Sequence, residues 1–251
     1  MKVSVVIPTY NEEAYIATCL DALMKQLVKP DEIIIVNNNS TDRTVEIAKK
    51  YPVRIVNEEQ QGMIQARNKG FDEAKYEIIA RTDADTILPP DWIKKIKNNF
   101  LNKNIVGLSG GGTVYDAPND LSKQAIEQSV KPYLRLMRSA LGHNCFIGSN
   151  MAIRKSAWKK AKNLVCLNNK DVHEDIDLSI HLAPFGKIKI DPALKVSTSL
   201  RRLRKLDGYF EYPYRVIKSI RKHKKFVMEE KSKKFVKNIV KQISLTNQLL
   251  N

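Results

Sequence analysis

The chain has 251 residues, 43% of them hydrophobic, and a net charge of +16. This length and apolar share suit one α/β domain with at most a modest appendage, and they exclude fibrous and low-complexity classes of protein. The three cysteines show no CxxC spacing, which argues against a disulfide framework or a zinc knuckle. We find no signal peptide and no apolar run of the roughly 20 residues that a membrane span needs. Together these observations predict a cytoplasmic protein.

The first 81 residues alternate between two kinds of hydrophobic pattern. Residues 3–7 form a β-branched run that is typical of a strand buried on both faces, and apolar residues then recur at a helical period through 14–26. The same alternation predicts strands at 32–36, 53–57 and 77–81 and helices at 41–48 and 63–74. Ser40 or Thr41 would cap the helix that runs to Ala48. Strands alternating with helices predict βαβ units and a mostly parallel sheet.

The second half of the chain has a less regular pattern. It predicts a helix at 91–100, a strand at 106–114, an amphipathic helix at 121–141, a polar loop at 142–150, a helix that starts in 172–178 and ends near Gly186, short strands at 188–190 and 195–198, and helices from 208 onward.

Three polar clusters follow predicted strands. They are Tyr10-Asn11, residues 37–39 and residues 83–85. Ligands of parallel α/β sheets bind outside the carboxyl ends of the strands. We therefore expect these clusters to share one rim of the sheet.

Two carboxylate motifs carry candidate chemistry. Asp83 and Asp85 are two apart in an extended segment, so both can face one Mg²⁺ or Mn²⁺ ion that bridges to a nucleotide diphosphate. The alternative is a solvated turn that caps the next helix. His173-Glu174-Asp175 offers a carboxylate base for an acceptor hydroxyl, and the alternative is a pair of acids that favour the positive end of a helix dipole.

An ordered series of motifs resembles the family-2 glycosyltransferases. It comprises residues 5–12 (VVIPTYNE), 36–42 (VNNNSTD), 62–70 (GMIQARNKG), 83–85 (DAD), 148–150 (GSN) and 174–178 (EDIDL), and it spans about the first 190 residues. The resemblance implies the GT-A fold, an α/β architecture with a mixed, mostly parallel sheet flanked by helices. It also implies a nucleotide-diphosphate sugar donor, a divalent cation (Mn²⁺ or Mg²⁺) and inversion at the anomeric carbon.

The resemblance also implies roles on the donor side. Thr9, Tyr10 and Glu12 lie where the family holds the base and the ribose. Asn38 stands where the family usually has an aspartate that recognises uracil. An amide both donates and accepts hydrogen bonds, whereas a carboxylate only accepts, so the identity of the base stays open. Arg67 lies where the family contacts the base or the diphosphate.

The remaining roles concern the metal, the base and the acceptor. Asp83 is expected to flank the ribose, Asp85 to bind the metal and Asp175 to act as the base. Glu174 is expected to orient the acceptor or to support Asp175. His143 could line the acceptor pocket, and Cys145 beside it is interpreted as a small buried hydrophobe.

Arg201 and Arg202 lie where many relatives place a metal-binding histidine or a mobile loop over the donor. No histidine occurs between Lys195 and Lys222, so a ligand of that kind is missing. The two arginines could instead clamp the diphosphate, because guanidinium groups pair bidentately with phosphate oxygens. The alternative is two ordinary surface arginines.

The C-terminal segment carries most of the positive charge. Residues 195–251 hold 16 Lys and Arg against four acidic residues. Within it, apolar residues recur at helical spacing among lysines at 233–243, so 209–251 could lie on an anionic membrane surface. The alternative is a helix that packs its apolar stripe on the domain. No aromatic platform accompanies the charge, so we expect no nucleic-acid partner.

Together these patterns predict a GT-A catalytic domain at 1–200, with a nucleotide-binding half at 1–105 and an acceptor-binding half at 106–200, and a basic helical extension at 201–251. The expected enzyme is an inverting, metal-assisted hexosyltransferase of the cytoplasm or the inner membrane face, with a lipid-linked acceptor or a surface polysaccharide. One alternative is a decayed nucleotide-sugar-binding protein, which Asn38 would favour. The other is a nucleotidyltransferase, but this sequence lacks the glycine-rich phosphate loop that such an enzyme is expected to carry after the first strand.

Overall fold

The computed structural model describes residues 1–167, 172–202 and 206–228, without the side chains of 202 and 206–213. Within these residues, eight strands form one sheet in the order β3-β2-β1-β4-β7-β6-β8-β5. The strands are β1 (Val3–Thr9), β2 (Glu32–Asn37), β3 (Arg54–Asn57), β4 (Ile78–Arg81), β5 (Thr86–Ile87), β6 (Ile105–Val114), β7 (Met151–Arg154) and β8 (Lys187–Thr198).

The sheet is mostly parallel, as the alternating pattern predicts. Strands β1 to β4 pair in parallel with their neighbours, and β6 pairs in parallel with β8. The exceptions are β7, which lies antiparallel between β4 and β6, and β5, which lies antiparallel to β8. Since β7 runs against both of its neighbours, its start lies at the same edge as the end of β4, where Arg81 pairs with Met151.

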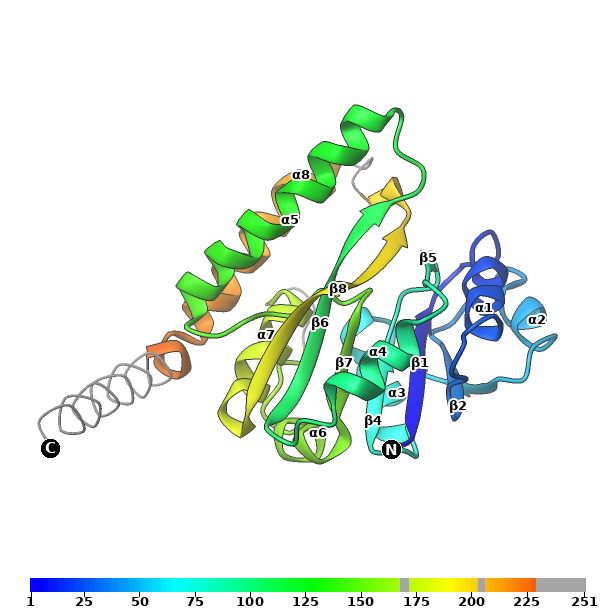
Figure 1. Ribbon diagram of the computed structural model, residues 1–251, viewed down its shortest axis with the longest axis horizontal. Helices are drawn as coiled ribbons and strands as arrows, with labels where there is room; N and C mark the ends of the chain where they lie inside the picture. The colour runs from blue at the N-terminus through cyan, green and yellow to red at the C-terminus, as the bar shows by residue number, and fades with distance from the viewer. Residues whose placement is uncertain (168–171, 203–205, 229–251) are drawn as a thin grey trace, which may run out of the picture.

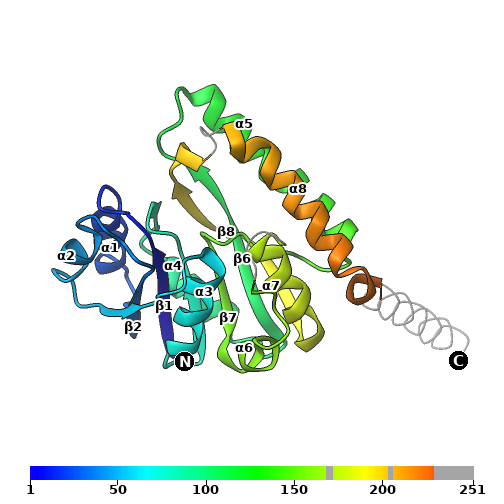
Figure 2. The ribbon, with the colours of Figure 1, turned by 180° about the vertical axis from the view of Figure 1, so that it is seen from behind.

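Helices cover both faces of the sheet (Figures 1 and 2). One core layer lies under α1 (Ile16–Met24) and α4 (Trp92–Asn99), and the other lies under α3 (Met63–Glu73), α6 (Lys155–Ala161) and α7 (Glu174–Leu182). The central strands are apolar on both sides because both faces are buried. The remaining helical segments are α2 (Thr44–Ala48), α5 (Asp120–Leu141), η1 (Ala183–Phe185), η2 (Leu200–Arg202) and α8 (Leu206–Lys222).

Helices α5 and α8 lie side by side in both views, and α5 contacts strand β6. The lower ends of both pack on α7 through a third apolar cluster that includes Met137, Ile176 and Val227. Across the parts of the chain that are described, no helix combines the length and the apolarity of a membrane span. The basic stripe predicted at 233–243 lies outside the described residues.

Two boundaries differ from the sequence prediction. Helix α2 begins only at Thr44, and neither Ser40 nor Thr41 caps it, because Asp42 Oδ1 accepts the Thr44 amide hydrogen at 2.9 Å. Strand β1 continues past the predicted end at residue 7 to Thr9. Pro8 is tolerated there because β1 pairs with β4 only as far as Val6, so the missing N–H of Pro8 leaves no ladder bond unmade.

The two short strands predicted at 188–190 and 195–198 are one strand, β8. Pro192 falls at an irregularity where the pairing with β6 shifts between Gly110 and Gly111, so the strand bulges around the proline and then resumes. Strand β7 and helix α6, together residues 151–161, had no predicted counterpart, and neither did the two-residue strand β5.

Candidate active site

The polar turns after β1, β2 and β4 meet on one rim of the sheet, as expected, and the segment after β3 joins them. Asn11 has a left-handed backbone with φ 54° and its side-chain Oδ1 accepts the Thr41 amide hydrogen at 2.8 Å. Asn39, with φ 64°, donates its side-chain amide to the Glu59 carbonyl at 2.7 Å. Asparagine tolerates this backbone region better than other residues with a side chain, which explains its use at these strand ends.

Asn38 holds the segment 58–62 in place. Its Nδ2 donates to the carbonyls of Glu58 and Gln60 at 2.8 and 2.9 Å, and its Oδ1 accepts the Gly62 amide hydrogen at 2.8 Å. An aspartate has no N–H to give to the two carbonyls. The departure from the family pattern therefore has a structural reason: the amide shapes the wall of the pocket described next.

A pocket of about 210 Å³ opens at this rim. Thr9, Tyr10, Glu12, Asn38 and Asp83 line it, together with Pro8, Gln61, Gly62, Met63, Ala66 and Ala84. The Tyr10 side chain is half exposed and forms an edge of the pocket, whereas the hydroxyl of the buried Thr9 donates to the Val36 carbonyl at 3.0 Å. The predicted base and ribose residues thus share one concave surface.

Arg81, at the end of β4, organises the carboxylates of the neighbouring cavity. Its guanidinium is buried and forms ion pairs with Asp83 at 3.2 Å, Glu174 at 2.8 Å and Asp175 at 3.2 Å. These three anions hold the pKa of Arg81 well above its usual value despite burial. The sequence analysis missed Arg81, although a charged residue inside an apolar strand next to Asp83 was an available clue.

Asp175 lies at the N-terminus of α7 and is almost completely buried. Its Oδ2 accepts the Gly148 amide hydrogen at 2.9 Å, and Oδ1 faces Arg81. Burial and the adjacent Glu174 raise the pKa of Asp175 above the ordinary aspartate range, against the opposite effect of Arg81. A carboxylate in this state is better suited to accept a proton near neutral pH than an exposed one.

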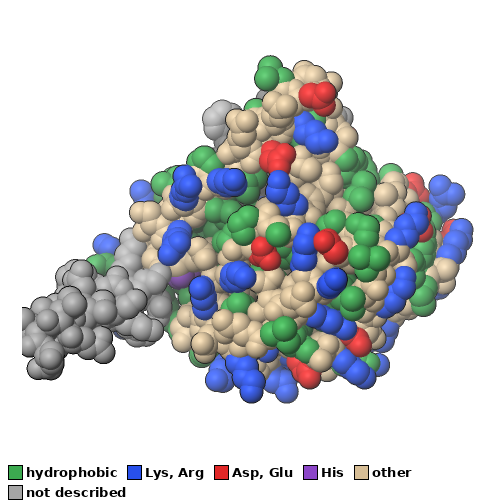
Figure 3. Space-filling model, viewed as in Figure 1, with side chains coloured by type: hydrophobic (Ala, Val, Ile, Leu, Met, Phe, Trp, Pro, Cys, Tyr) green, Lys and Arg blue, Asp and Glu red, His purple; other side chains and the backbone are tan. Residues whose placement is uncertain are grey.

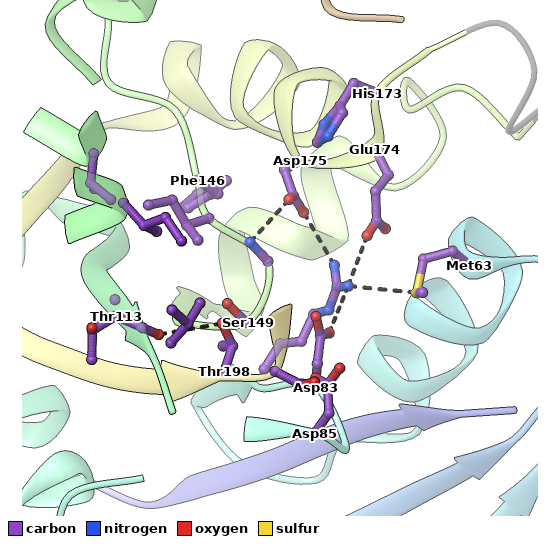
Figure 4. Close-up of a pocket in the computed structure, with 18 of the residues that line it drawn as sticks. Met63, Asp83, Asp85, Thr113, Phe146, Ser149, His173, Glu174, Asp175 and Thr198 are labelled. Carbon is purple, nitrogen blue, oxygen red and sulfur yellow. Dashed lines mark hydrogen bonds and ion pairs between the residues drawn. The ribbon is translucent and has the colours of Figure 1, made fainter. Parts of the chain in front are cut away.

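These groups face a cavity of about 590 Å³. Figure 4 shows Asp83 and Asp85 on one side, Glu174 and Asp175 on another, and Ser149 between Thr113 and the carboxylates. The cavity shares Met63 and Asp83 with the smaller pocket at the strand rim. The two hollows therefore adjoin, and together they bring eight of the predicted site residues to one place.

Asp85 is paired with Arg201. The Arg201 Nε lies 2.7 Å from Asp85 Oδ2, and its Nη2 lies 2.5 and 2.6 Å from the two Glu12 oxygens. Both anions hold the pKa of Arg201 above its usual value. Arg201 is thus no ordinary surface arginine. The side chain of Arg202 is outside the described residues.

The formal charges around the cavity do not balance. Five carboxylates (Glu12, Asp83, Asp85, Glu174 and Asp175) and four guanidinium groups (Arg67, Arg81, Arg201 and Arg215) lie at or next to the cavity, so acidic side chains outnumber basic ones by one within the described residues. Hard oxygen ligands with a net negative charge suit a divalent cation such as Mg²⁺ or Mn²⁺.

Two predicted residues lie away from the cavity walls. Arg67 is completely buried and donates to the Glu174 carbonyl at 2.9 Å, so it positions the start of α7. His143 Nδ1 faces the Asn144 carbonyl at 2.9 Å, and the residue does not line the 590 Å³ cavity. Its neighbour Cys145 is buried, as interpreted from the sequence, and burial raises the pKa of its thiol to about 12.

Known structures share this fold. Glucosyl-3-phosphoglycerate synthase from Mycobacterium tuberculosis, in complex with Mn²⁺, UDP and phosphoglyceric acid, aligns with a TM-score of 0.64 at 20% identity, over 87% of this chain and 77% of that one. The mannosyltransferase PcManGT from Pyrobaculum calidifontis, in complex with GDP-Man and Mn²⁺, aligns with a TM-score of 0.68 at 21% identity, over 92% and 69%. The predicted GT-A fold is confirmed.

Sequence comparison agrees with the structural one. The glycosyltransferase EpsH of Bacillus subtilis (strain 168) is 38% identical over 99 residues, which are 38% of this chain and 29% of EpsH, so the match spans less than a third of that relative. The model of the family described as "Glycosyl transferase family 2" matches residues 4–161. Since that match covers more than half of the sequence, the chain belongs to glycosyl transferase family 2.

Proposed function

We propose that this protein transfers a hexose from a nucleotide-diphosphate donor to an acceptor hydroxyl with inversion, and that Asp175 is the base. The observation that carries the proposal is the cavity that joins Asp83 and Asp85 on one wall to Asp175 on another. A transferase needs a place for the diphosphate and a base across from it, and the cavity holds groups suited to both tasks.

The donor is assigned to the two adjoining hollows. Its base and ribose would occupy the pocket of Thr9, Tyr10, Glu12 and Asn38, with the diphosphate near Asp83 and Asp85. A divalent cation held by Asp85 would neutralise the diphosphate and stabilise it as a leaving group. The solved relatives contain Mn²⁺ with UDP or with GDP-Man, so either base is compatible with this arrangement.

Arg201 and Arg202 are assigned to the diphosphate. In the donor-free protein Arg201 pairs with Asp85 and Glu12. Phosphate oxygens compete well for a guanidinium because they offer the same bidentate geometry with more charge. We expect Arg201 to exchange its carboxylates for the diphosphate when the donor binds, which frees Asp85.

The chemical step is assigned to Asp175. The acceptor oxygen forms a bond to the anomeric carbon from the face opposite the diphosphate, the bond to the diphosphate oxygen breaks, and the acceptor proton moves to Asp175. Arg81 and the Gly148 amide fix the carboxylate in position. Glu174 and Arg67 hold the start of α7, so their role is to position Asp175 and the acceptor.

A basic groove suggests an anionic acceptor. It lies between α5 and the β6–β8 pair, encloses about 890 Å³ and meets the active-site cavity at Gly112 and Val130. Its cationic lining residues are Lys131, Arg135, Arg138 and Lys195. Lys and Arg side chains outnumber acidic ones across this face (Figure 3). A lipid-linked phosphate or an acidic polysaccharide, held on the inner face of a membrane, fits such a surface.

The proposal retains the predicted organisation, with donor residues in 1–105, acceptor residues in 106–200 and a basic extension from 201. It is tested with Asp175→Asn. We expect turnover of the sugar nucleotide to fall by about 10²–10⁴-fold, because the base is lost. The Kd for nucleotide, measured calorimetrically with Mn²⁺ over a panel of UDP, GDP and dTDP, should stay unchanged because Asp175 lies outside the donor pocket.

Two outcomes would contradict the proposal. Asp175→Asn with most of its turnover would remove the base assignment. A wild-type protein that binds nucleotides but releases none from any sugar nucleotide would favour a decayed, non-catalytic protein.

A further inference from the structure

A second cluster of metal-binding side chains lies behind the active site, on the other side of α7. The Cys166 Sγ, an Asp177 carboxylate oxygen and a His223 ring nitrogen all lie within 4.8 Å of one another. They come from the segment after α6, from α7 and from the residue that follows α8. Asp177 and His223 are buried, and Cys166 is partly buried.

The tautomer of His223 leaves a bare nitrogen inside this cluster. Its Nδ1 faces the Ser219 carbonyl at 2.9 Å, and a carbonyl can only accept, so Nδ1 carries the hydrogen. In the neutral ring the lone pair of Nε2 then points at Asp177 Oδ1 at 3.2 Å and lies 3.6 Å from Cys166 Sγ. Two acceptor atoms, His223 Nε2 and Asp177 Oδ1, therefore face one another.

His181 is an independent indication of a ligand. It is 3% exposed, and neither of its ring nitrogens has a hydrogen-bond partner among the described residues; the same holds for Asp177 Oδ1. The His181 Nε2 is directed at that oxygen at 3.5 Å. Buried polar atoms without partners are rare and costly, and one of them, Asp177 Oδ1, lies inside the cluster of Cys166, Asp177 and His223.

We propose that Cys166, Asp177 and His223 bind one Zn²⁺ ion. A tetrahedral zinc with bonds of about 2.0–2.3 Å has edges of about 3.3–3.7 Å between neighbouring ligand atoms. The observed separations of 3.2 Å between His223 Nε2 and Asp177 Oδ1 and of 3.6 Å between His223 Nε2 and Cys166 Sγ fall at or close to this range. One sulfur, one imidazole and one carboxylate form a ligand set of borderline softness that suits zinc better than Mg²⁺ or Mn²⁺.

The surroundings of the cluster support a metal. The second oxygen of Asp177 accepts the Cys166 amide hydrogen at 3.0 Å, and the Ser219 carbonyl orients His223, so two ligands are fixed by outer hydrogen bonds. Zinc binding would release the thiol proton of Cys166 and compensate the resulting charge.

The site would tie three segments together. It would join α8 and the segment after α6 to α7, whose first residues are Glu174 and Asp175. The ligands are too far apart in sequence to form a knuckle motif, so their spacing carries no recognisable pattern.

The test uses the full chain and cobalt as a spectroscopic probe. After treatment with a strong chelator, the wild type should bind one equivalent of Co²⁺ with a thiolate charge-transfer band and tetrahedral visible bands, and Zn²⁺ should displace it. Cys166→Ser should lose the charge-transfer band and bind Zn²⁺ at least about tenfold more weakly. Cys145→Ser, which changes another buried cysteine, and Asp85→Ala should both retain the band.

X-ray absorption on the zinc-loaded wild type tests the site without a variant. We expect one sulfur at about 2.3 Å and nitrogen or oxygen ligands at about 2.0–2.1 Å. Absence of stoichiometric Zn²⁺ or Co²⁺ binding, a zinc shell without sulfur, or a cobalt band that survives Cys166→Ser would each overturn the proposal.

Discussion

Arg81 shows how one residue sets the geometry of several others. It is buried at the end of β4 and pairs with Asp83, Glu174 and Asp175, which come from two distant parts of the chain. Without its charge these carboxylates would repel one another in a low-dielectric site. Arg81 therefore allows the predicted metal-side and base-side acids to lie in one cavity.

The electrostatics of Asp175 predict a pH dependence. The proposed mechanism needs the base form of Asp175 for turnover, and burial together with Glu174 raises its pKa, so the acidic limb of kcat/KM should lie above the ordinary aspartate value of about 3.9. Glu174→Gln removes a negative neighbour and leaves Arg81 to act on Asp175, which lowers that pKa. The limb should therefore move to lower pH in the pH–rate profile.

The matched control is Glu46→Gln, which removes an exposed acid on α2. It should leave the acidic limb where it is in the wild type. An acidic limb that stays at the same pH or moves to higher pH in Glu174→Gln would show that the titrating group is not Asp175.

At the residue scale, motifs predicted which side chains line the same cavity but not their hydrogen-bond and ion-pair partners. The short motifs placed Asp83, Asp85 and Asp175 correctly around one cavity. Asn38 and Arg201 have partners that depend on backbone atoms and side chains far along the chain, namely the carbonyls at 58 and 60 and the acids at 12 and 85. Such contacts leave no local pattern in a sequence.

Among the elements, the loop before β7 fixes Asp175, the proposed base. Gly148 donates its amide to Asp175, and an added Cβ there would lie 2.7 and 2.9 Å from the two carboxylate oxygens. Any side chain at this position must displace the carboxylate or the loop. The glycine of the GSN motif is thus required by the close approach of α7.

Gly148→Ala should therefore lower kcat by about 10²-fold, because a displacement on the order of 1 Å is enough to spoil alignment of a reacting group. Nucleotide affinity should change little, since Gly148 does not line the donor pocket. Gly111→Ala is the matched control, because a Cβ there meets only Val130 at 3.9 Å. Steady-state kinetics of both variants check this, and equal losses in the two would contradict it.

Elements were predictable where the hydrophobic period is long and uniform, and less so where a strand is short or interrupted. Strands β1, β2 and β4 are continuous apolar runs, whereas β7 has four residues and leads directly into α6. Strand β8 contains Pro192, which broke the prediction in two although pairing with β6 resumes beyond it. Partners across the sheet, which a single sequence does not display, decided both cases.

For the whole molecule, the excess of positive charge is unevenly distributed over the surface. The basic groove beside α5 adjoins the cavity, while the donor side is dominated by carboxylates. An anionic acceptor would be attracted to the face that carries Lys131 and Arg135 and repelled from the uncompensated acids of the donor-free site.

The double variant Lys131→Glu with Arg135→Glu should lower kcat/KM for an anionic acceptor by about tenfold and weaken its dependence on salt. Lys49→Glu with Lys50→Glu changes the net charge equally at an exposed site beyond α2 and should have little effect. Kinetics at several ionic strengths measure both. If the two double variants showed the same kcat/KM and the same salt dependence, the acceptor would not bind in the basic groove.

The antiparallel insertion of β7 has an evolutionary consequence. After β5 the chain forms α4, β6 and α5 and then returns to the sheet as β7. The return has a fixed register, because Met151 of β7 pairs with Arg81 at the end of β4. The excursion at 115–142 can thus be lengthened, shortened or exchanged while both ends stay clamped. Descendants could acquire new acceptors by remodelling this one segment and inherit the transfer chemistry intact.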